Sequence, residues 1–185
     1  LDYSSYVTSG ITVNLGGGTA AGLASFSSIE NVVGTSGDDT LTGNTDANVL
    51  TGGDGNDTFV YSAGGDTYTG GEAGETTGDT IDYSSYGSAL TVDLTTQTTD
   101  SGDTISGIEN ITGSATAVNT LTGNGDDNVL VGGNQADSFY TAVGAGTDTF
   151  NGGAGTDTLF YTGSGITVDL TSDADTLTSI EAITL

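Results

Sequence analysis

The stretch "GGDGNDTFV" (residues 52–60) places three glycines and two aspartates in its first six positions and ends in a β-branched and aromatic tail. Glycine tolerates positive φ, so it permits a sharp turn in which backbone carbonyl oxygens point inward. Thr58-Phe59-Val60 has the composition of a short strand whose middle side chain faces the core. The stretch therefore predicts an acidic loop followed directly by a strand.

This unit recurs every nine residues in two blocks, 34–82 and 113–160. The first block also contains "GTSGDDTLT" (34–42), "GNTDANVLT" (43–51), "YSAGGDTYT" (61–69) and, with an insertion, "GGEAGETTGDTI" (70–81). The second contains "GSATAVNTLT" (113–122), "GNGDDNVLV" (123–131), "GGNQADSFY" (132–140), "TAVGAGTDTFN" (141–151) and "GGAGTDTLF" (152–160). An Asp or Asn precedes the inward apolar residue by two in each unit, so the register survives the insertions.

A longer repeat of about eighty residues contains the nine-residue one. "LDYSSYVTSGITVNL" (1–15) returns as "IDYSSYGSALTVDL" (81–94) and, more weakly, as "LFYTGSGITVDL" (159–170). We interpret the chain as one β-solenoid over 1–185, with repeats 1–80 and 81–158 and a partial repeat 159–185. Both ends fall inside the pattern, so we expect either a fragment or processed product of a longer array, or a subunit that stacks head to tail.

The charge balance is the second informative feature. The 185 residues include 25 Asp and Glu but no Lys, Arg, His or Cys, which gives a formal charge of −25. Because such a chain repels itself, it either stays extended or binds cations. Short clusters of β-branched and aromatic residues argue against disorder. The composition excludes disulfides and disfavours nucleic acid as a partner, and no apolar run approaches the ~20 residues of a membrane span.

"GGDGNDTFV" (52–60) and "GGAGTDTLF" (152–160) match the pattern G-G-x-G-x-D-x-U-x. The chain thereby resembles RTX, or hemolysin-type, calcium-binding repeat proteins. The resemblance implies an all-β fold, a right-handed parallel β-roll or β-solenoid, in which two nonapeptides make one turn and calcium lies between successive Gly-Asp loops. Carboxylate and carbonyl oxygens suit Ca²⁺, and the absence of His and Cys makes zinc and copper sites improbable.

Carried onto this chain, the resemblance implies that sixth-position residues ligate calcium in pairs two units apart. The implied pairs are Asp39 with Asp57, Asp57 with Asp79, Asn48 with Asp66, Asn119 with Asp137, Asp137 with Asp157, and Asn128 with Asp148. Loop carbonyl oxygens complete the shells, for instance those of Gly52, Asp54, Gly132, Asn134 and Gly152. We expect the strong sites at Asp39–Asp57 and Asp137–Asp157. Asparagine adds no charge, so its pairs should be weaker, as should those after the insertions, at Asp79 and Asp148.

Segments outside the nonapeptides predict further strands at 11–15, 90–94 and 166–170, where apolar residues alternate, and at 28–33, 103–106, 107–112 and 175–178. Glu30, Glu109 and Glu181 recur at one place in each repeat, which favours a structural row over paired catalytic carboxylates. Tyr3, Tyr6, Tyr83 and Tyr86 are interpreted as packing or interface residues rather than a sugar platform.

Three functions remain open at this point. The first is a calcium-rigidified structural module of a secreted or cell-surface protein, such as a surface layer, adhesin or filament. The second is the secretion and folding module of an enzyme or toxin exported by a type I system. The third is an enzyme, which is disfavoured because His, Lys, Arg and Cys are absent. The expected partners are calcium and, in the structural case, further copies or neighbouring repeats, without membrane insertion.

Overall fold

A computed structural model describes residues 1–5, 9–71, 73–142, 146–162, 176–178 and 182–184. Every secondary-structure element assigned within these ranges is a β-strand. The described residues contain no helix long and apolar enough to cross a membrane. The chain divides into two compact units: unit 1 is Leu1–Asp82 with Thr98–Ile108, and unit 2 is Tyr83–Gln97 with Glu109–Leu185. The interpretation of 1–185 as one solenoid stays a prediction.

Unit 1 is built from two sheets whose strands are mostly parallel. One sheet has the order β8-β6-β4-β1-β2 and the other the order β10-β11-β7-β5-β3. The strands of the first are β1 (Thr12–Asn14), β2 (Thr19–Ala20), β4 (Thr40–Thr42), β6 (Thr58–Val60) and β8 (Thr80–Asp82). Those of the second are β3 (Asn31–Val33), β5 (Val49–Thr51), β7 (Thr67–Thr69), β10 (Thr98–Thr99) and β11 (Thr104–Ser106).

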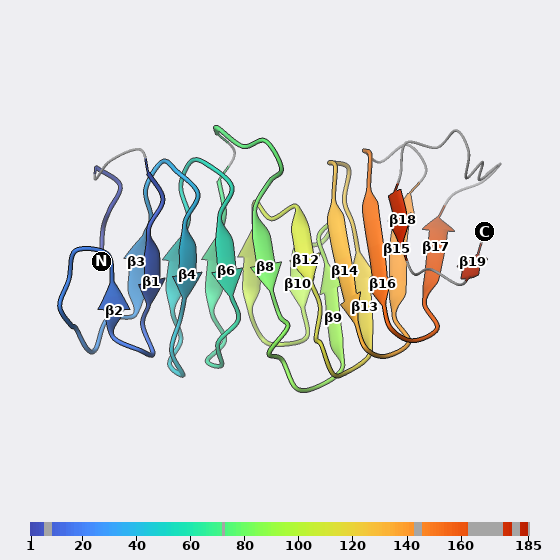
Figure 1. Cartoon of the computed structure of the whole chain (residues 1–185), viewed down its shortest axis with the longest axis horizontal. Coiled ribbons are helices and arrows are strands. Elements are labelled where there is room, and N and C mark those ends of the chain that lie inside the picture. The colour runs from blue at the N-terminus through green and yellow to red at the C-terminus, as the bar shows by residue number, and fades with distance from the viewer. Residues whose placement is uncertain (6–8, 72, 143–145, 163–175, 179–181, 185) are drawn as a thin grey trace. The chain divides into compact units, whose positions relative to one another are not determined.

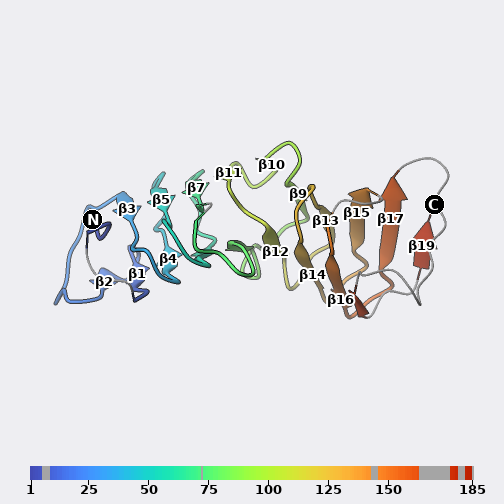
Figure 2. The ribbon, with the colours of Figure 1, turned by 90° about the horizontal axis from the view of Figure 1, so that it is seen from above.

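Successive nonapeptides alternate between these two sheets. Strands β4, β6 and β8 pair in parallel and lie side by side (Figure 1), whereas β5 and β7 pair in the other sheet, as Figure 2 shows from above. The β4–β6 and β5–β7 pairs join residues eighteen positions apart, such as Leu41 with Phe59, and the insertion lengthens this spacing between β6 and β8. Two nonapeptides therefore make one turn, and the fold is the parallel β-roll that the repeat predicts.

The core of unit 1 consists of the middle residue of each strand. Leu41, Phe59 and Ile81 stack in one sheet, and Leu50 and Tyr68 stack in the other; all five side chains are fully buried. The rings of Phe59 and Tyr68 lie 5.6 Å apart, which shows that the two sheets face each other. Each turn thus buries one apolar side chain per strand, and the turns are held together by ladders of such side chains.

Leu50 and its neighbour Val49 provide a direct test of this core. Leu50 is fully buried and Val49 is 45% exposed. We expect Leu50→Ala to lower the free energy of unfolding in calcium by about 2–5 kcal/mol, because it removes buried contacts and leaves a cavity. Val49→Ala should change it by less than about 0.5 kcal/mol. Urea denaturation of both variants checks this; equal losses would contradict the assignment of inward and outward positions.

Unit 2 repeats the arrangement, with sheet orders β18-β16-β14-β12 and β19-β17-β15-β13-β9. Its strands are β9 (Leu90–Asp93), β12 (Asn110–Thr112), β13 (Asn119–Thr122), β14 (Val129–Gly133), β15 (Ser138–Ala142), β16 (Thr149–Gly153), β17 (Thr158–Thr162), β18 (Thr176–Thr178) and β19 (Ala182–Thr184). The rings of Phe139 and Phe150 meet across the two sheets at 5.9 Å. The strand predicted at 166–170 lies outside the described residues.

The segments without the nonapeptide form turns of the same rolls. Val13 of β1 pairs with Leu41, and Val92 of β9 pairs with Leu121, so the apolar ladders continue through these turns. Two short antiparallel strands were not predicted: β2 pairs with β1, and β10 pairs with β11. Each of these short strands forms a hairpin with its neighbour, and the extra residues of the wider turn supply the hairpin.

The insertion in the fifth nonapeptide leaves the register of unit 1 intact. Asn56 Oδ1 accepts hydrogen bonds from the backbone N–H groups of Thr76 (2.9 Å), Thr77 (2.8 Å) and Gly78 (3.1 Å). This side chain fixes the end of the inserted segment, and Thr80 then pairs with Thr58 as in an uninterrupted repeat. The extra residues are therefore accommodated outside the strand pairing.

Candidate metal centres

The sixth-position residues form four hydrogen-bonded ladders, two in each unit. The first ladder is Asp39–Asp57–Asp79 and the second is Asn48–Asp66–Asp103, both in unit 1. The third is Asn119–Asp137–Asp157 and the fourth is Asn128–Asp148, both in unit 2. In each, the backbone N–H of one residue donates to Oδ1 of the next, at 2.6–3.0 Å. All six pairs implied by the register are therefore neighbours, including those beyond the insertions.

Asp103 in the second ladder was missed by the sequence reasoning, which assigned its segment only as a strand. Its Oδ1 accepts a hydrogen bond from the backbone N–H of Asp66 at 2.8 Å. The signal was present: Gly102-Asp103-Thr104-Ile105 repeats the letters of Gly78-Asp79-Thr80-Ile81. The nonapeptide register breaks between these segments, so the match is not visible when the period alone is followed.

The ladder carboxylates are buried without any cationic side chain. Asp57, Asp79, Asp137 and Asp157 are each at most 1% exposed, and the chain contains no Lys, Arg or His. Burying an ionised carboxylate is costly unless it is paired or bound to a metal. These carboxylates, which belong to the first and third ladders, therefore need a source of positive charge that the side chains of the polypeptide do not supply.

Oxygen acceptors converge at the glycines that begin the repeats of the first and third ladders. A Cβ added at Gly34 would overlap both Asp39 Oδ2 and the Gly52 carbonyl oxygen. At Gly132 it would overlap Asp137 Oδ2 and lie 2.6 Å from the Gly152 carbonyl oxygen. Each of these carboxylate oxygens accepts a backbone N–H, from Thr35 at 2.6 Å and from Gly133 at 2.7 Å. Acceptor oxygens that meet in this way attract a cation, and glycine leaves room for one.

Asp57 gives the clearest sign of a cation site. Its Oδ2 is buried and accepts no hydrogen bond from the described residues, and it faces the space beside Gly52 that a Cβ would fill. Burial raises the pKa of Asp57 to about 7, and the charges of Asp79, Asp39 and Asp38 add to the increase, although a hydrogen bond from the backbone of Asp39 opposes it. A bound cation would offset both the burial of the charge and the repulsion from the neighbouring carboxylates, and would therefore lower the pKa of Asp57.

The donor set fits calcium. The groups that converge on the first and third ladders are carboxylate and carbonyl oxygens, which are the ligands of hard cations with high coordination numbers. Of the predicted carbonyl ligands, Gly52 and Gly152 lie at these points, whereas Asp54 and Asn134 lie on exposed loop positions and stay predictions, as does Gly132. Ligation by each individual residue likewise remains a prediction.

The comparison with known protein families agrees with this geometry. The profile described as the RTX calcium-binding nonapeptide repeat (4 copies) matches residues 33–68, 103–139, 114–147, 122–159 and 142–164, which together exceed half of the chain. The chain belongs to the RTX repeat family. RTX repeats bind Ca²⁺, so this chain is a calcium-binding RTX module with the parallel β-roll fold. Among curated proteins, none matched the chain.

The asparagines of this RTX module are hydrogen-bonded at both ends of their amides. Asn48 Oδ1 accepts from the backbone N–H of Asn44, and Asn128 Oδ1 accepts from that of Asn124. The Nδ2 group of Asn119 donates to Asp137 Oδ1 at 2.9 Å. Neutral amides thus satisfy these positions locally. That pairs containing asparagine bind calcium more weakly stays a prediction.

The raised pKa of Asp57 makes the stability of the metal-free RTX module depend on pH. Its pKa is raised from 3.8 to about 7 in the folded state, so between these values the folded state binds more protons than the unfolded chain. Stability without calcium should therefore fall as the pH rises from about 4 to 7. Thermal melting in a chelator at several pH values checks this. Asp57→Asn should flatten the dependence, and a metal-free wild type that gains stability over this range would contradict it.

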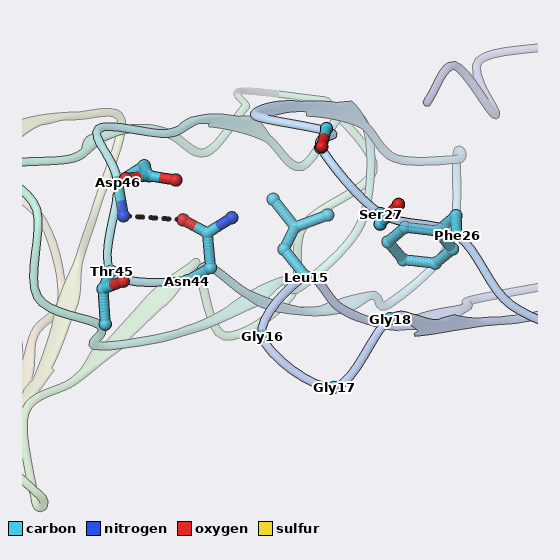
Figure 3. Close-up of a pocket in the computed structure, with 10 residues that line it drawn as sticks. Leu15, Gly16, Gly17, Gly18, Phe26, Ser27, Asn44, Thr45 and Asp46 are labelled. Carbon is cyan, nitrogen blue, oxygen red and sulfur yellow. Dashed lines mark hydrogen bonds between the residues drawn. The ribbon is translucent and has the colours of Figure 1, made fainter.

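A hollow of about 440 Å³ in unit 1 lies beside the hairpin that follows β1. Its lining includes Leu15, Phe26, Asn44 and Asp46 (Figure 3), and the backbone N–H of Asp46 donates to Asn44 Oδ1. Asp46 is the one ionisable side chain among the lining residues. Glycoside hydrolysis commonly needs two carboxylates, and the lining of this hollow presents one.

Of the other residues singled out in the sequence, two tyrosines lie in the core. Tyr3 and Tyr83 are buried in the core, which agrees with a packing role, and the rings of Tyr83 and Tyr86 meet edge-on at 6.2 Å. Glu30 is exposed and Glu109 is half-buried. Tyr6 and Glu181 lie outside the described residues.

Proposed function

We propose that this RTX module is a calcium-rigidified structural element of a secreted, extracellular protein, as in a surface layer, adhesin or filament. The observation that carries the proposal is the continuity of the apolar ladders. In each unit the turns without nonapeptides extend the same inward stack, for example from Val13 through Leu41 to Phe59. The described chain is thus devoted to stacking turns, which is the construction of a stiff element rather than of an asymmetric pocket.

Calcium availability supports an extracellular location. Sites in extracellular calcium-binding modules have dissociation constants near 10⁻⁴–10⁻³ M, which millimolar calcium outside cells can fill. Inside a cell the unfilled ladders leave buried carboxylates uncompensated, so the chain should stay largely unfolded until export. Secretion by a type I system fits this order of events and is the usual route for RTX proteins.

The second candidate is a secretion and folding module attached to an enzyme or toxin, which the family match favours. It requires a catalytic domain elsewhere in the same protein, and such a domain would reverse our order of preference. We propose that the module itself is not an enzyme. Catalytic roles for nucleophiles, bases and electrophilic groups draw mainly on His, Lys, Arg and Cys, none of which the chain contains.

Single-molecule force spectroscopy tests the structural proposal. The module is placed between two marker domains and stretched in millimolar calcium and in a chelator. We expect a defined unfolding event in calcium and much lower resistance in the chelator. Equal resistance to force in both conditions would contradict a load-bearing role. Calcium binding is measured in parallel, so that this failure can be distinguished from a failure to bind calcium.

Association of copies is also part of this proposal. A stacked solenoid presents a strand edge at each end, and such edges accept further strands. Light scattering with added calcium should show assemblies that grow with protein concentration. A strictly monomeric species at high concentration would remove this part of the proposal.

A further inference from the structure

The second ladder differs from the first in the donors that surround its carboxylates. Asp66 Oδ2 accepts hydrogen bonds from Ser62 Oγ at 2.7 Å and from the Tyr68 hydroxyl at 2.9 Å. Asp66 Oδ1 accepts from the backbone N–H of Asn48 at 2.9 Å. Both oxygens of this buried carboxylate are therefore held by donors of the protein, whereas Asp57 Oδ2 in the first ladder accepts none from the described residues.

The sequence of the fourth nonapeptide explains this difference. Its first two positions are Tyr61 and Ser62, where "GGDGNDTFV" has Gly52 and Gly53. A Cβ added at Gly43 would overlap Ser62 Oγ and Asn48 Oδ1. The equivalent space beside Gly34 in the first ladder faces two acceptor oxygens instead, so a hydroxyl occupies in one ladder the place that acceptors surround in the other.

Tyr68 supplies the second hydroxyl from inside the core. It is the middle residue of β7 and fully buried, at a position where other repeats carry Leu41, Leu50 or Phe59. Its hydroxyl lies beside the ladder and donates to Asp66 Oδ2 at 2.9 Å.

The remaining aspartates of the second and fourth ladders show the same feature. Thr141 Oγ1 donates to Asp148 Oδ2 at 2.8 Å, and Thr141 stands at the first position of its repeat, where others have glycine. Ser101 Oγ donates to Asp103 Oδ2 at 2.6 Å. In the first ladder Thr35 Oγ1 donates to Asp39 at Oδ1 instead. Asp39 Oδ2 accepts the backbone N–H of Thr35 at 2.6 Å and faces the space beside Gly34.

We infer that calcium loads only one edge of each unit, at the first and third ladders, and that the hydroxyls of Ser62, Tyr68 and Thr141 take the cation's place on the other edge. A cation at Asp66 would have to break two hydrogen bonds to a charged acceptor, which are about twice as strong as neutral ones. It would also have to displace a tyrosine from a close-packed core. The inference rests on calcium binding by the RTX module and is independent of its structural role.

Two matched variants test this division. Asp57→Asn and Asp66→Asn make the same chemical change at two buried ladder positions, and Asn48 and Asn128 show that asparagine fits such positions. Bound calcium is counted by equilibrium dialysis in millimolar calcium. We expect Asp57→Asn to lose at least one ion and Asp66→Asn to keep the wild-type number. An equal loss in both variants would overturn the inference.

A gain-of-site variant covers the case in which Asp66→Asn does not fold. Ser62→Gly combined with Tyr68→Phe restores a glycine and removes both hydroxyls, while the aromatic ring stays in the core. This double variant should bind one more calcium ion than the wild type. An unchanged count would show that the hydroxyls do not exclude calcium and would overturn the inference. A wild type that binds no calcium would overturn it together with the assignment of the first and third ladders.

Discussion

Asp57→Asn is expected to raise the calcium concentration needed to fold unit 1 by about tenfold or more. The substitution keeps an oxygen that can accept the ladder hydrogen bond from the backbone of Asp39, but it removes the charge. Calcium affinity depends on the number of charged ligands, and a tenfold loss corresponds to only about 1.4 kcal/mol. Calcium titrations followed by circular dichroism, with wild type and variant side by side, measure the shift.

Asp54→Asn is the matched control for this variant. Asp54 is three residues away in the same loop, but its side chain is exposed, and only its carbonyl oxygen is a predicted ligand. The net charge changes equally in the two variants, so any general effect of charge on folding appears in both. We expect a shift of less than about twofold for Asp54→Asn, since surface changes are worth about 0.5 kcal/mol or less. Similar shifts in both variants would mean that Asp57 has no special role.

Gly52→Ala is expected to prevent calcium binding at the first ladder and to destabilise unit 1 by about 3 kcal/mol, near the upper end of typical overpacking costs. The added Cβ would overlap Asp57 Oδ2 and lie 2.6 Å from Asp57 Cγ. It would therefore displace the carboxylate that the site requires. Denaturant unfolding in calcium measures the stability, and calcium dialysis measures the loss of the ion.

Gly125→Ala is the control for this change. Gly125 lies in an equivalent acidic loop of unit 2, and a Cβ there would meet nothing within 4 Å. Replacing glycine by alanine where the backbone allows it stabilises a protein by about 0.4–1 kcal/mol. We expect a neutral to slightly stabilising effect with unchanged calcium binding. If Gly52→Ala were tolerated equally well, the space beside Gly52 would not be needed for a cation.

Much of the fold could be predicted because one short pattern carries both the loop and the strand. Phe59 is buried at the middle of β6, where alternation of side chains places it, and the nine-residue register gives its neighbours Leu41 and Ile81 without further information. The pairing of Asp57 with Asp79 across the insertion followed from the same register. A loop can accommodate extra residues, but a shift of the strand register by one residue would turn every side chain of that strand to the other face.

The parts that escaped prediction are polar contacts that the nine-residue pattern does not reveal. Asp103 joins the second ladder from outside the nonapeptide blocks, 37 positions after Asp66. Tyr68 reads as an ordinary core aromatic, and only the three-dimensional arrangement shows its hydroxyl at Asp66. The role of Asn56 in holding the insertion is of the same kind. The contacts of Asp103 and Asn56 join different turns, whereas that of Tyr68 depends on the direction of a side chain within one repeat. The period reveals neither.

Circular dichroism during a calcium titration of the chelator-treated chain shows whether bound calcium supplies the positive charge that the first and third ladders lack. We expect a disordered or loosely folded chain in the chelator at neutral pH and a cooperative transition to β-structure as calcium is added, without an equal response to magnesium. A chain that keeps its full β-structure in the chelator, and does not change when calcium is added, would contradict this role of calcium.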